Sequence, residues 1–387
     1  MSTYLGQGNA ELTRAGGPEL QLLLMAGRLV LGTAQDTEAL ALLRRPLHWP
    51  RLYAQADAEG MSGLLASQLL RLARVYDLAL PLEPLTQALH GIFTHNGAMF
   101  AALATLRQAL RQRGLQAILL KGGALIETVY GGQAGLRPLS DLDLLIKAAD
   151  FGAVVEVLRQ QDFRPLSPAS AFFMDGSAAI DLHTEISGAA RLRRRALAFR
   201  FDAEALWREA VPLDPHDATL LTLAPTHQFL HLAVHGLKHS FARLFWFVDM
   251  GLVLPCVAWE ELLSWAEDSG ALRALAYALG GLQALMGIEI PTAVLTRLPR
   301  LNRLERAFLR RVVRRQEMQT LGEVMVAFSV PGVMDKLRYL LEFGFPRHEV
   351  LADVFPTTPT WLRYPRRLLQ GVTLGIGAGR GFGRSLR

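Results

Sequence analysis

The stretch "RPLSDLDLLI" (137–146) places two carboxylates, Asp141 and Asp143, two positions apart among leucines and an isoleucine. Aspartate disfavours strands, and a buried carboxylate without a partner is costly. Because side chains alternate between the faces of a strand, a strand here would put both acids on one face and most of the apolar side chains on the other. The two acids repel each other on that face, and a divalent cation would neutralise both.

A phosphate-binding turn is predicted just before this stretch. The apolar run "LQAILL" (115–120) has the character of a buried strand, and it leads through Lys121, Gly122 and Gly123 into the helix-like "ALIETVY". Backbone amides of glycines between a strand and a helix can approach a phosphate closely, and a helix N-terminus favours negative charge. We therefore expect these three residues and Arg137 to bind the phosphates of a nucleotide.

A third acid follows in the segment "AFFMDGSAAIDLHTEI" (171–186), which is typical of a hairpin with an Asp-Gly turn. In the second strand of that hairpin, Asp181, His183 and Glu185 share one face. Flanking isoleucine and leucine repeat the pattern of an acid inside an apolar strand. The sequence thus supplies acids from two neighbouring strands.

Three carboxylates in this arrangement are what a two-metal phosphoryl or nucleotidyl transfer site requires. Mg²⁺ prefers carboxylate oxygens together with water and substrate phosphates. We expect Asp141, Asp143 and Asp181 to be catalytic and to bind Mg²⁺ or Mn²⁺, with Glu185 as an alternative third ligand. An aspartyl-nucleophile phosphohydrolase or a glycosyltransferase is disfavoured, because its D-x-D ends an apolar strand, whereas here the apolar residues follow the motif.

The order of strand, glycine turn, helix, "hDhDh" strand and later "hDh" strand resembles the DNA polymerase β-like nucleotidyltransferase superfamily. Within it, "LLKGGALIETVY" (119–130), "GLRPLSDLDLLI" (135–146) and "HLAVHGLKHSFARLFWFVDM" (231–250) are similar to a bacterial uncharacterised nucleotidyltransferase family. The helical lead-in "LHWPRLYAQADAEGMSGLLASQLLR" (47–71) resembles the same family. The resemblance covers most of residues 40–340.

This resemblance implies an α+β fold with a central mixed sheet between helical regions. It implies Mg²⁺-dependent transfer of a nucleoside monophosphate from an NTP to a hydroxyl or phosphate of a small-molecule, peptide or protein acceptor, releasing pyrophosphate. By position, Gly122 and Gly123 match the phosphate turn, Asp141 and Asp143 the metal-binding pair, and Asp181 the third acid. Gly123 stands where many members have serine, which removes a hydroxyl contact to a phosphate.

Helical spacing of apolar residues before and after the central motifs predicts four parts of the chain. They are an N-terminal helical region (1–114), a nucleotidyltransferase core (115–187), a C-terminal helical domain (188–342) and a basic tail of loops containing Pro and Gly (343–387).

Four histidines recur at every fourth residue of an expected helix: His227, His231, His235 and His239. Such spacing suits zinc, but the glutamate of H-E-x-x-H is absent and the single Cys256 is distant. Packing in a helical bundle is one reading, and contact with the acceptor or phosphates, which the family resemblance supports, is another. The residues expected to make such contacts are His183, Glu185, His235, Lys238, His239 and Asp249.

Composition sets wider limits. Hydrophobic residues make up 51% and charged residues 20% of the 387, which is typical of a globular protein. The longest run without Asp, Glu, Lys, Arg or His, 274–288, is shorter than the roughly 18–20 residues of a membrane span. The first residues lack a basic stretch followed by an apolar one, so we expect no signal peptide and a cytoplasmic protein.

The net charge of +6 comes mostly from arginine, which indicates either genome composition or an anionic substrate. Nucleic acid is an unlikely partner, because the arginine clusters, such as "RLRRR" (191–195), are not interleaved with aromatic residues. Two alternatives stay open. One is a catalytically silent module that binds a nucleotide or a partner, and the other is an RNA terminal nucleotidyltransferase, favoured only by the basic balance.

Overall fold

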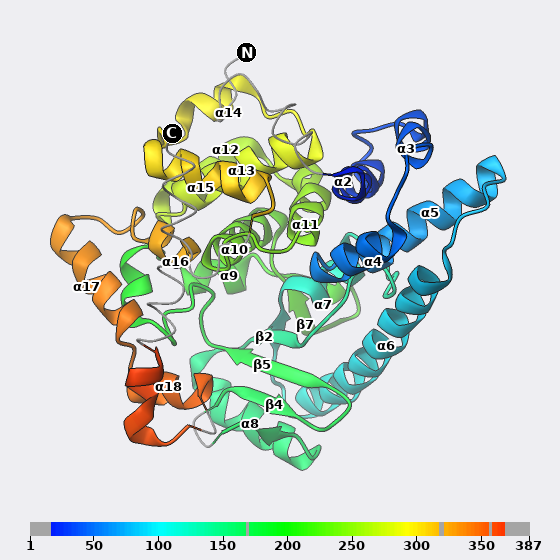
Figure 1. Ribbon diagram of the computed structural model, residues 1–387. Helices are drawn as coiled ribbons and strands as arrows, with labels where there is room; N and C mark the ends of the chain where they lie inside the picture. The colour runs from blue at the N-terminus through cyan, green and yellow to red at the C-terminus, as the bar shows by residue number, and fades with distance from the viewer. Residues whose placement is uncertain (1–16, 168–169, 317–320, 356–357, 368–387) are drawn as a thin grey trace.

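The computed structural model describes residues 17–167, 170–316, 321–355 and 358–367, and it has a mixed sheet with helices packed around it (Figure 1). The strands of the sheet follow the order β3-β4-β5-β2-β1-β7-β6. Their bounds are β1 (Ala117–Leu119), β2 (Leu142–Leu145), β3 (Arg164–Pro165), β4 (Phe172–Met174), β5 (Ala179–His183), β6 (Val211–Asp214) and β7 (Asp217–Thr222). The α+β class is confirmed. The predicted absence of a signal peptide concerns residues outside the described ranges.

The centre of the sheet consists of the strands that the sequence predicts. Strand β1 pairs antiparallel with β2, and β2 pairs parallel with β5. Strands β4 and β5 form the predicted antiparallel hairpin. Every residue of β1 and β2 is buried, because helices cover the sheet on both sides, and this explains the dense apolar pattern of these strands.

The described residues of the N-terminal region, 17–114, are largely helical. Its helices are α2 (Pro18–Val30), α3 (Asp36–Leu43), α4 (Trp49–Ala58), α5 (Ser62–Tyr76) and α6 (Glu83–Gln112). Helix α6 runs along the sheet, and together with α8 (Phe151–Gln160) it buries the apolar face that contains Leu142, Leu144 and Ile180. None of the helices in the described ranges has both the length and the apolar character needed to cross a bilayer.

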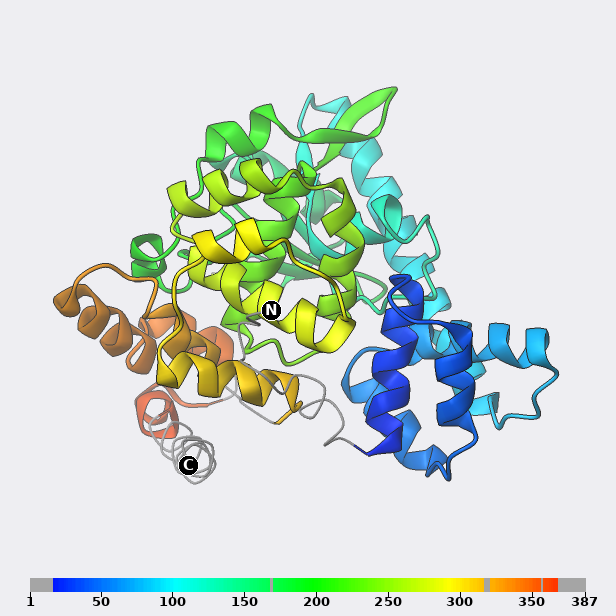
Figure 2. The ribbon, with the colours of Figure 1, turned by 90° about the horizontal axis from the view of Figure 1, so that it is seen from above.

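The C-terminal part of the chain has the buried helix α10 (Pro225–Lys238) and further helices before and after it in the sequence. They are α9 (Ala203–Arg208), α11 (Phe245–Val253), α12 (Trp259–Asp268), α13 (Leu272–Gly281), α14 (Thr292–Arg297), α15 (Arg303–Val313), α16 (Leu321–Val326), α17 (Val333–Gly344) and α18 (His348–Val354). Single-turn segments complete the chain: η1 (Ala148–Asp150), η2 (Arg193–Leu197), η3 (Leu254–Cys256) and the π-type η4 (Leu282–Met286). In both views α2–α5 and α17–α18 lie on different sides of the molecule (Figures 1 and 2).

Helix α7 (Lys121–Thr128) joins two hydrophobic cores. Its Ala124 and Ile126 pack into the core between the sheet, α6 and α8. Its Leu125 packs with Leu64 of α5 and Leu230 of α10 in a larger core that the N-terminal and C-terminal helices share. The N-terminal and C-terminal helices therefore lie on either side of the sheet in sequence, but they share one hydrophobic core that includes Leu125 of α7.

Two expectations about secondary structure are wrong. Residues 211–222 lie in the region predicted to be helical, yet they form β6 and β7, and β7 pairs parallel with β1. The strands are short, and Pro212 and Asp214 interrupt their alternation, so the period-2 signal is weak. The tail predicted as loops contains α18, whereas its residues 368–387 lie outside the described ranges.

The close contact between α5 and the loop before β2 yields a stability prediction. A Cβ atom on Gly63 would lie 2.1 Å from the carbonyl oxygen of Gly135 and 2.8 Å from that of Leu136. Because both neighbours are backbone atoms, Gly63→Ala should lower the free energy of unfolding by about 2–3 kcal/mol, measured by urea denaturation.

The matched control is Gly91→Ala in α6, where a Cβ atom would have no neighbour within 4 Å. This change should leave stability unchanged or raise it by up to about 1 kcal/mol, since alanine is the better helix former. Equal effects of the two substitutions would contradict the predicted contact.

Candidate active site

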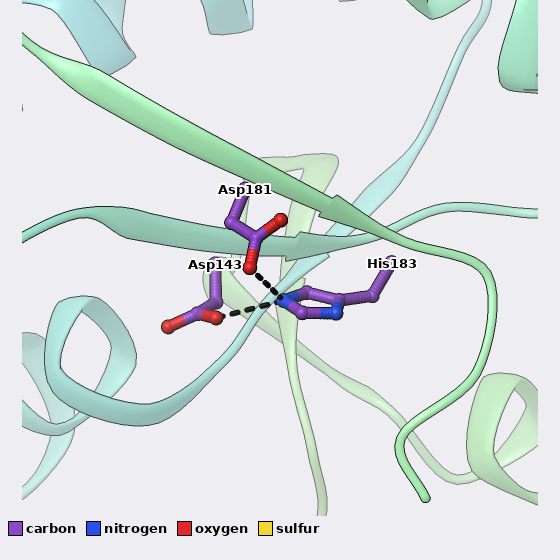
Figure 3. A group of neighbouring side chains, drawn as sticks. All are labelled: Asp143, Asp181 and His183. Atoms are coloured by element: carbon purple, nitrogen blue, oxygen red, sulfur yellow. Dashed lines mark hydrogen bonds and ion pairs between the residues drawn. The ribbon is translucent and has the colours of Figure 1, made fainter. Parts of the chain in front are cut away.

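The acids of β2 and β5 meet because the two strands are parallel and in register. Asp143 is directly opposite Asp181, and Leu145 is opposite His183. His183 Nε2 lies 2.7 Å from Asp143 Oδ1 and 3.3 Å from Asp181 Oδ2 (Figure 3). One potential ligand atom from each of these three residues falls within 4.8 Å of the others. Two carboxylates and an imidazole at this spacing form a donor set that fits a divalent cation.

Asp143 is the most enclosed of these groups, with 4% of its surface exposed. Lys121 Nζ donates to its Oδ1 over 2.5 Å. Burial by itself would raise the pKa of Asp143, but the charge of Lys121 and the hydrogen bond from His183 outweigh burial and hold the pKa well below its usual range. Asp143 is therefore an ionised carboxylate held by two donors.

The other two acids lack such compensation. Burial raises the pKa of Asp181 despite the opposing charge of His183. Burial and then the charge of Asp143 raise the pKa of Asp141, whose Oδ1 accepts a hydrogen bond of 2.6 Å from Ser140 Oγ. Asp141 precedes β2 and does not belong to the group of three potential ligands. The role of Asp141 in metal binding stays a prediction. The raised pKa values of Asp141 and Asp181 show that their charged forms are disfavoured here, and a bound cation would stabilise those charged forms.

The glycine turn lies at the start of α7, as predicted. Lys121 has a φ of 48°, a left-handed conformation that is strained for a side chain of this size. The amide of Leu120 donates to the carbonyl of Asp143 over 2.9 Å, which fixes the turn beside β2. No side chain caps the N-terminus of α7, so the first amides of the helix lack a side-chain acceptor.

At both glycines of the turn, Gly122 and Gly123, a larger side chain would collide with neighbouring atoms. A Cβ atom on Gly122 would lie 1.7 Å from Arg137 Nη1, so no other residue fits there without moving the guanidinium. A Cβ atom on Gly123 would lie 2.9 Å from Leu119 Cδ1 and 3.1 Å from Leu142 Cδ2. A serine at 123 would therefore direct its Cβ atom at the apolar core beneath the turn.

Arg137 and Asp249 form a buried ion pair with each other. Arg137 Nε and Nη2 donate to the Asp249 carboxylate over 3.0–3.2 Å, and Arg137 Nη1 donates to the carbonyl of Pro138. The hydroxyl of Tyr130 donates to Asp249 over 2.8 Å, and the guanidinium lies 4.7 Å from the centre of the Phe245 ring. Burial raises the pKa of Asp249 despite the charge of Arg137.

This pair changes our interpretation of both residues. Asp249 has no exposed surface, and its carboxylate is already bound by Arg137 and Tyr130. The expected acceptor contact of Asp249 and phosphate contact of Arg137 are therefore replaced by a structural link between the strand loop and α11. We retain neither residue as a ligand contact.

The C-terminal end of α10 faces a turn that follows β5. Glu185 organises this turn by accepting the amides of Ser187, Gly188 and Ala190, so it has a structural role and is not part of the ligand group. Lys238 Nζ donates to the carbonyl of Ser187 over 3.3 Å.

Lys238 lies close to Arg195, whose guanidinium is paired with Glu323. A Cβ atom on Gly188 would lie 3.0 Å from Lys238 Nζ and 2.6 Å from Arg195 Nη1, so two cationic side chains meet there. Burial, followed by the charges of Arg195 and Lys121, lowers the pKa of Lys238 to about 7. An anionic ligand beside Lys238 would favour the charged form of this lysine.

The four histidines of α10 have different surroundings. His227 packs edge-on against Trp265, while His235 and His239 pack around Trp246. His231 is 3% exposed, and neither of its ring nitrogens has a hydrogen-bond partner in the described part of the chain. None of the four belongs to the group of potential metal ligands. Packing within the helical bundle accounts for His227. Contacts of His235 and His239 with an acceptor or phosphate stay predictions.

A family model described as "Uncharacterised nucleotidyltransferase" matches residues 45–287. The chain belongs to this family. No curated protein and no solved structure matches it. The matched part of the chain contains the glycine turn, the three potential metal ligands and the Arg137–Asp249 pair, and it ends before α14.

The sequence predicts that the acids of β2 and β5 and the glycine turn form one site, and two features of their surroundings differ from that prediction. His183 is predicted as an acceptor or phosphate contact on the face of Asp181, whereas the structure places it among the three potential metal ligands. Arg195 was assigned only to a basic run. Its approach to Lys238 depends on the fold of residues 187–195, which has no local signature.

Removal of Arg137 should make the stability depend on pH. In Arg137→Met the buried Asp249 loses the cation that lowers its pKa, so we expect a loss of about 3–5 kcal/mol near pH 7. A raised pKa in the folded state means that stability is lost as pH rises through it, so the deficit should shrink towards about pH 5. Urea unfolding at both pH values measures this.

The control is the double variant Arg137→Met/Asp249→Asn, which removes both charges. It should be more stable near pH 7 than Arg137→Met and should lack the added pH dependence. An Arg137→Met deficit that is the same at both pH values would contradict a buried, unpaired Asp249.

Proposed function

We propose that this protein is a metal-dependent nucleotidyltransferase that moves a nucleoside monophosphate from an NTP to an acceptor. The acceptor oxygen, from a hydroxyl or phosphate of a small molecule, peptide or protein, would bond to the α-phosphorus, and the bond to the β-phosphate oxygen would break to release pyrophosphate. The observation that carries this proposal is Asp143 directly opposite Asp181, with the uncapped start of α7 beside them.

Asp143, Asp181 and His183 would hold the divalent cation, with Asp141 beside them for a second ion. When bound, Mg²⁺ or Mn²⁺ supplies charge neutralisation for the triphosphate and activation of the attacking oxygen. Asp181, which is less enclosed than Asp143, would take up the proton of an acceptor hydroxyl. The roles of Asp141, Asp143 and Asp181 follow the family motif, whereas the role of His183 is proposed from its position beside Asp143 and Asp181.

The N-terminal turn of α7 would hold the triphosphate. The amides of Gly122 and Gly123 point along a helix start that no side chain caps, which favours an anion. Lys121 now binds Asp143, and a cation at the carboxylates would leave its ammonium available for a phosphate. Packing of Arg137 against Gly122 would keep this turn in place without a direct contact to the nucleotide.

The acceptor or the outer phosphates would bind at the end of α10. Lys238 would supply positive charge beside the turn after β5, where Arg195 is paired with Glu323, and His235 and His239 lie on the same helix end with Trp246. An NTP donor also favours action in the cytoplasm. The competing function is a catalytically silent module that binds a nucleotide or partner, and it is separated from an enzyme by whether bound NTP is turned over.

Label transfer tests the reaction. The protein is incubated with Mg²⁺ or Mn²⁺, each α-labelled NTP in turn and fractionated cell extract, and we expect label on one acceptor fraction together with pyrophosphate. Asp143→Asn should reduce the rate at least about a thousandfold, since it removes the central ligand. It should also weaken Mn²⁺ binding measured by calorimetry.

The control is Asp268→Asn at the exposed end of α12, which should leave both the rate and Mn²⁺ binding unchanged. Transfer that survives Asp143→Asn would exclude the proposed site. NTP and metal binding without transfer to any fraction would support the silent module instead.

The role of Lys238 can be separated from that of the metal ligands. Lys238→Met should raise the KM for the NTP or the acceptor about 10–100-fold, because a hydrogen bond to a charged group contributes about 1.5–3 kcal/mol. Lys238→Arg should retain part of the affinity, and Lys147→Met, beyond the end of β2, should have no effect. Unchanged KM values for Lys238→Met would place the acceptor elsewhere.

A further inference from the structure

Helix α10 carries a row of imidazole rings beside the candidate active site. His231, His235 and the capping residue His239 follow one another at every fourth position, so they lie on one side of the helix. The ring centres of His231 and His235 are 6.4 Å apart, and those of His235 and His239 are 4.6 Å apart. Trp246 of the neighbouring α11 lies 5.2 Å from His235 and 5.9 Å from His239 (both helices in Figure 1). We call these four residues the ring row.

The ring row leads from the candidate metal ligands towards the protein surface. At its inner end His231 is 3% exposed, and the charges of Lys121 and Asp143 both act on its pKa. Further along, His235 is partly buried and His239 is exposed. The row thus borders the place that we propose for a triphosphate, and its outer end is open to solvent.

The inner ring is polar but unpaired. Both ring nitrogens of His231 are buried and have no hydrogen-bond partner in the part of the chain that the structure describes, whereas Glu209 lies 3.5 Å from Nε2 of His227. Unpaired buried polar atoms are costly, and an apolar side chain would pack at position 231 without that cost. Packing alone therefore does not account for His231. A ligand that brings a hydrogen-bonding group to the inner end of the row would account for it.

The rings of the row are uncharged at neutral pH. Burial, followed by the charge of Lys238, lowers the pKa of His239 to about 4, and burial followed by the charge of Lys121 lowers the pKa of His235. A neutral imidazole has one donor and one acceptor nitrogen, and its flat face, like that of an indole, is suited to stacking. Phosphate oxygens only accept hydrogen bonds, and the two lysines serve them better. The row therefore suits a flat, uncharged ring whose edge carries both donors and acceptors.

We propose that the ring row binds the nucleobase of the donor NTP. This inference rests on the proposed nucleotidyl transfer and adds the part of the site that would distinguish one NTP from another. Every NTP brings a flat base that stacks on aromatic side chains, whereas the proposed reaction requires no ring in the acceptor. Trp246, His235 and His239 would stack on the base, and His231 would hydrogen-bond to the nucleoside. His235 and His239 are thereby assigned to the donor rather than to the acceptor.

Two other occupants fit the ring row less well. A metal ion needs ligand atoms that converge, but the group of potential ligands found among the described residues contains none of these histidines. A phosphate or another anion would lie with Lys238. At 3.6 residues per turn, Lys238 and His239 lie about 100° apart around the helix axis, so this cation and the outer ring are on different edges of α10. The Lys238 edge is left for the acceptor.

Calorimetry on the full-length protein with Mg²⁺ tests the proposal. One set of probes consists of the α,β-methylene analogues of ATP, GTP, CTP and UTP, which do not release pyrophosphate. The other probe is inorganic tripolyphosphate, which lacks base and ribose. We expect at least one analogue to bind about tenfold or more tightly than tripolyphosphate, because stacking of the base adds to the affinity of the phosphates.

Substitutions in the row should act on the nucleotide analogues and not on tripolyphosphate. Trp246→Leu and His235→Ala should each weaken binding of the preferred analogue about fivefold or more. His231→Leu should weaken it too, while the Tm stays unchanged or rises because two unpaired polar atoms are removed. His231→Gln should retain part of the affinity. The matched controls, Trp361→Leu at a side chain 74% exposed and His95→Ala at an exposed position of α6, should bind every probe as the unmodified protein does.

The outcomes separate this inference from the proposed function. Equal affinity for tripolyphosphate and all four analogues, or unchanged analogue affinity in Trp246→Leu and His235→Ala, would overturn the nucleobase assignment and leave the phosphate site in place. Variants that raise only the KM of the acceptor in the label-transfer assay would also overturn it, since the rings would then contact the acceptor. Parallel loss of tripolyphosphate binding and Tm would show a structural role instead. Absence of binding by every probe would overturn the proposed function as well.

Discussion

The repulsion between Asp143 and Asp181 is the constraint around which the site is organised. In-register pairing of β2 with β5 makes them direct neighbours. Two carboxylates roughly 5 Å apart repel by about 3 kcal/mol at an effective dielectric constant of about 20. Lys121 and His183 both donate to Asp143, so one acid is neutralised and the other is left with its charge. Lys121 and His183 also lie where the proposed cation and triphosphate would bind. The residues that now offset the charge of Asp143 are therefore the same ones that the proposed reaction would use.

The position of the glycine turn depends on a second buried charge pair. The guanidinium of Arg137 packs against Gly122 and also donates to Asp249 of α11. One side chain therefore connects the turn to a C-terminal helix. Helix α7, which begins at this turn, also joins the sheet core to the helical core. Strands β2 and β5 alone therefore do not fix the position of the turn. This agrees with a family match that continues through α11 rather than ending with the sheet.

The sequence predicted the parts of the fold that leave a local pattern. Strand β1, the turn, α7, β2 and the β4–β5 hairpin were each recognised from a run of fewer than twenty residues, and the alternation of Asp181 and His183 was read correctly. Strands β6 and β7 were missed because their alternation is short and interrupted. The Arg137–Asp249 pair was missed for another reason. Its members are 112 residues apart, and periodicity carries no information about which buried charges meet.

The positive net charge is not spread evenly along the chain. From the sequence it indicated either genome composition or an anionic substrate, and both readings treat the charge as uniform. Residues 1–299, which contain the whole candidate site, have slightly more acids than bases. The excess of basic residues comes from residues 300–387 of the sequence, which follow the family match. Attraction of an NTP by the proposed site would therefore depend on a few placed cations such as Lys121 and Lys238 rather than on the net charge.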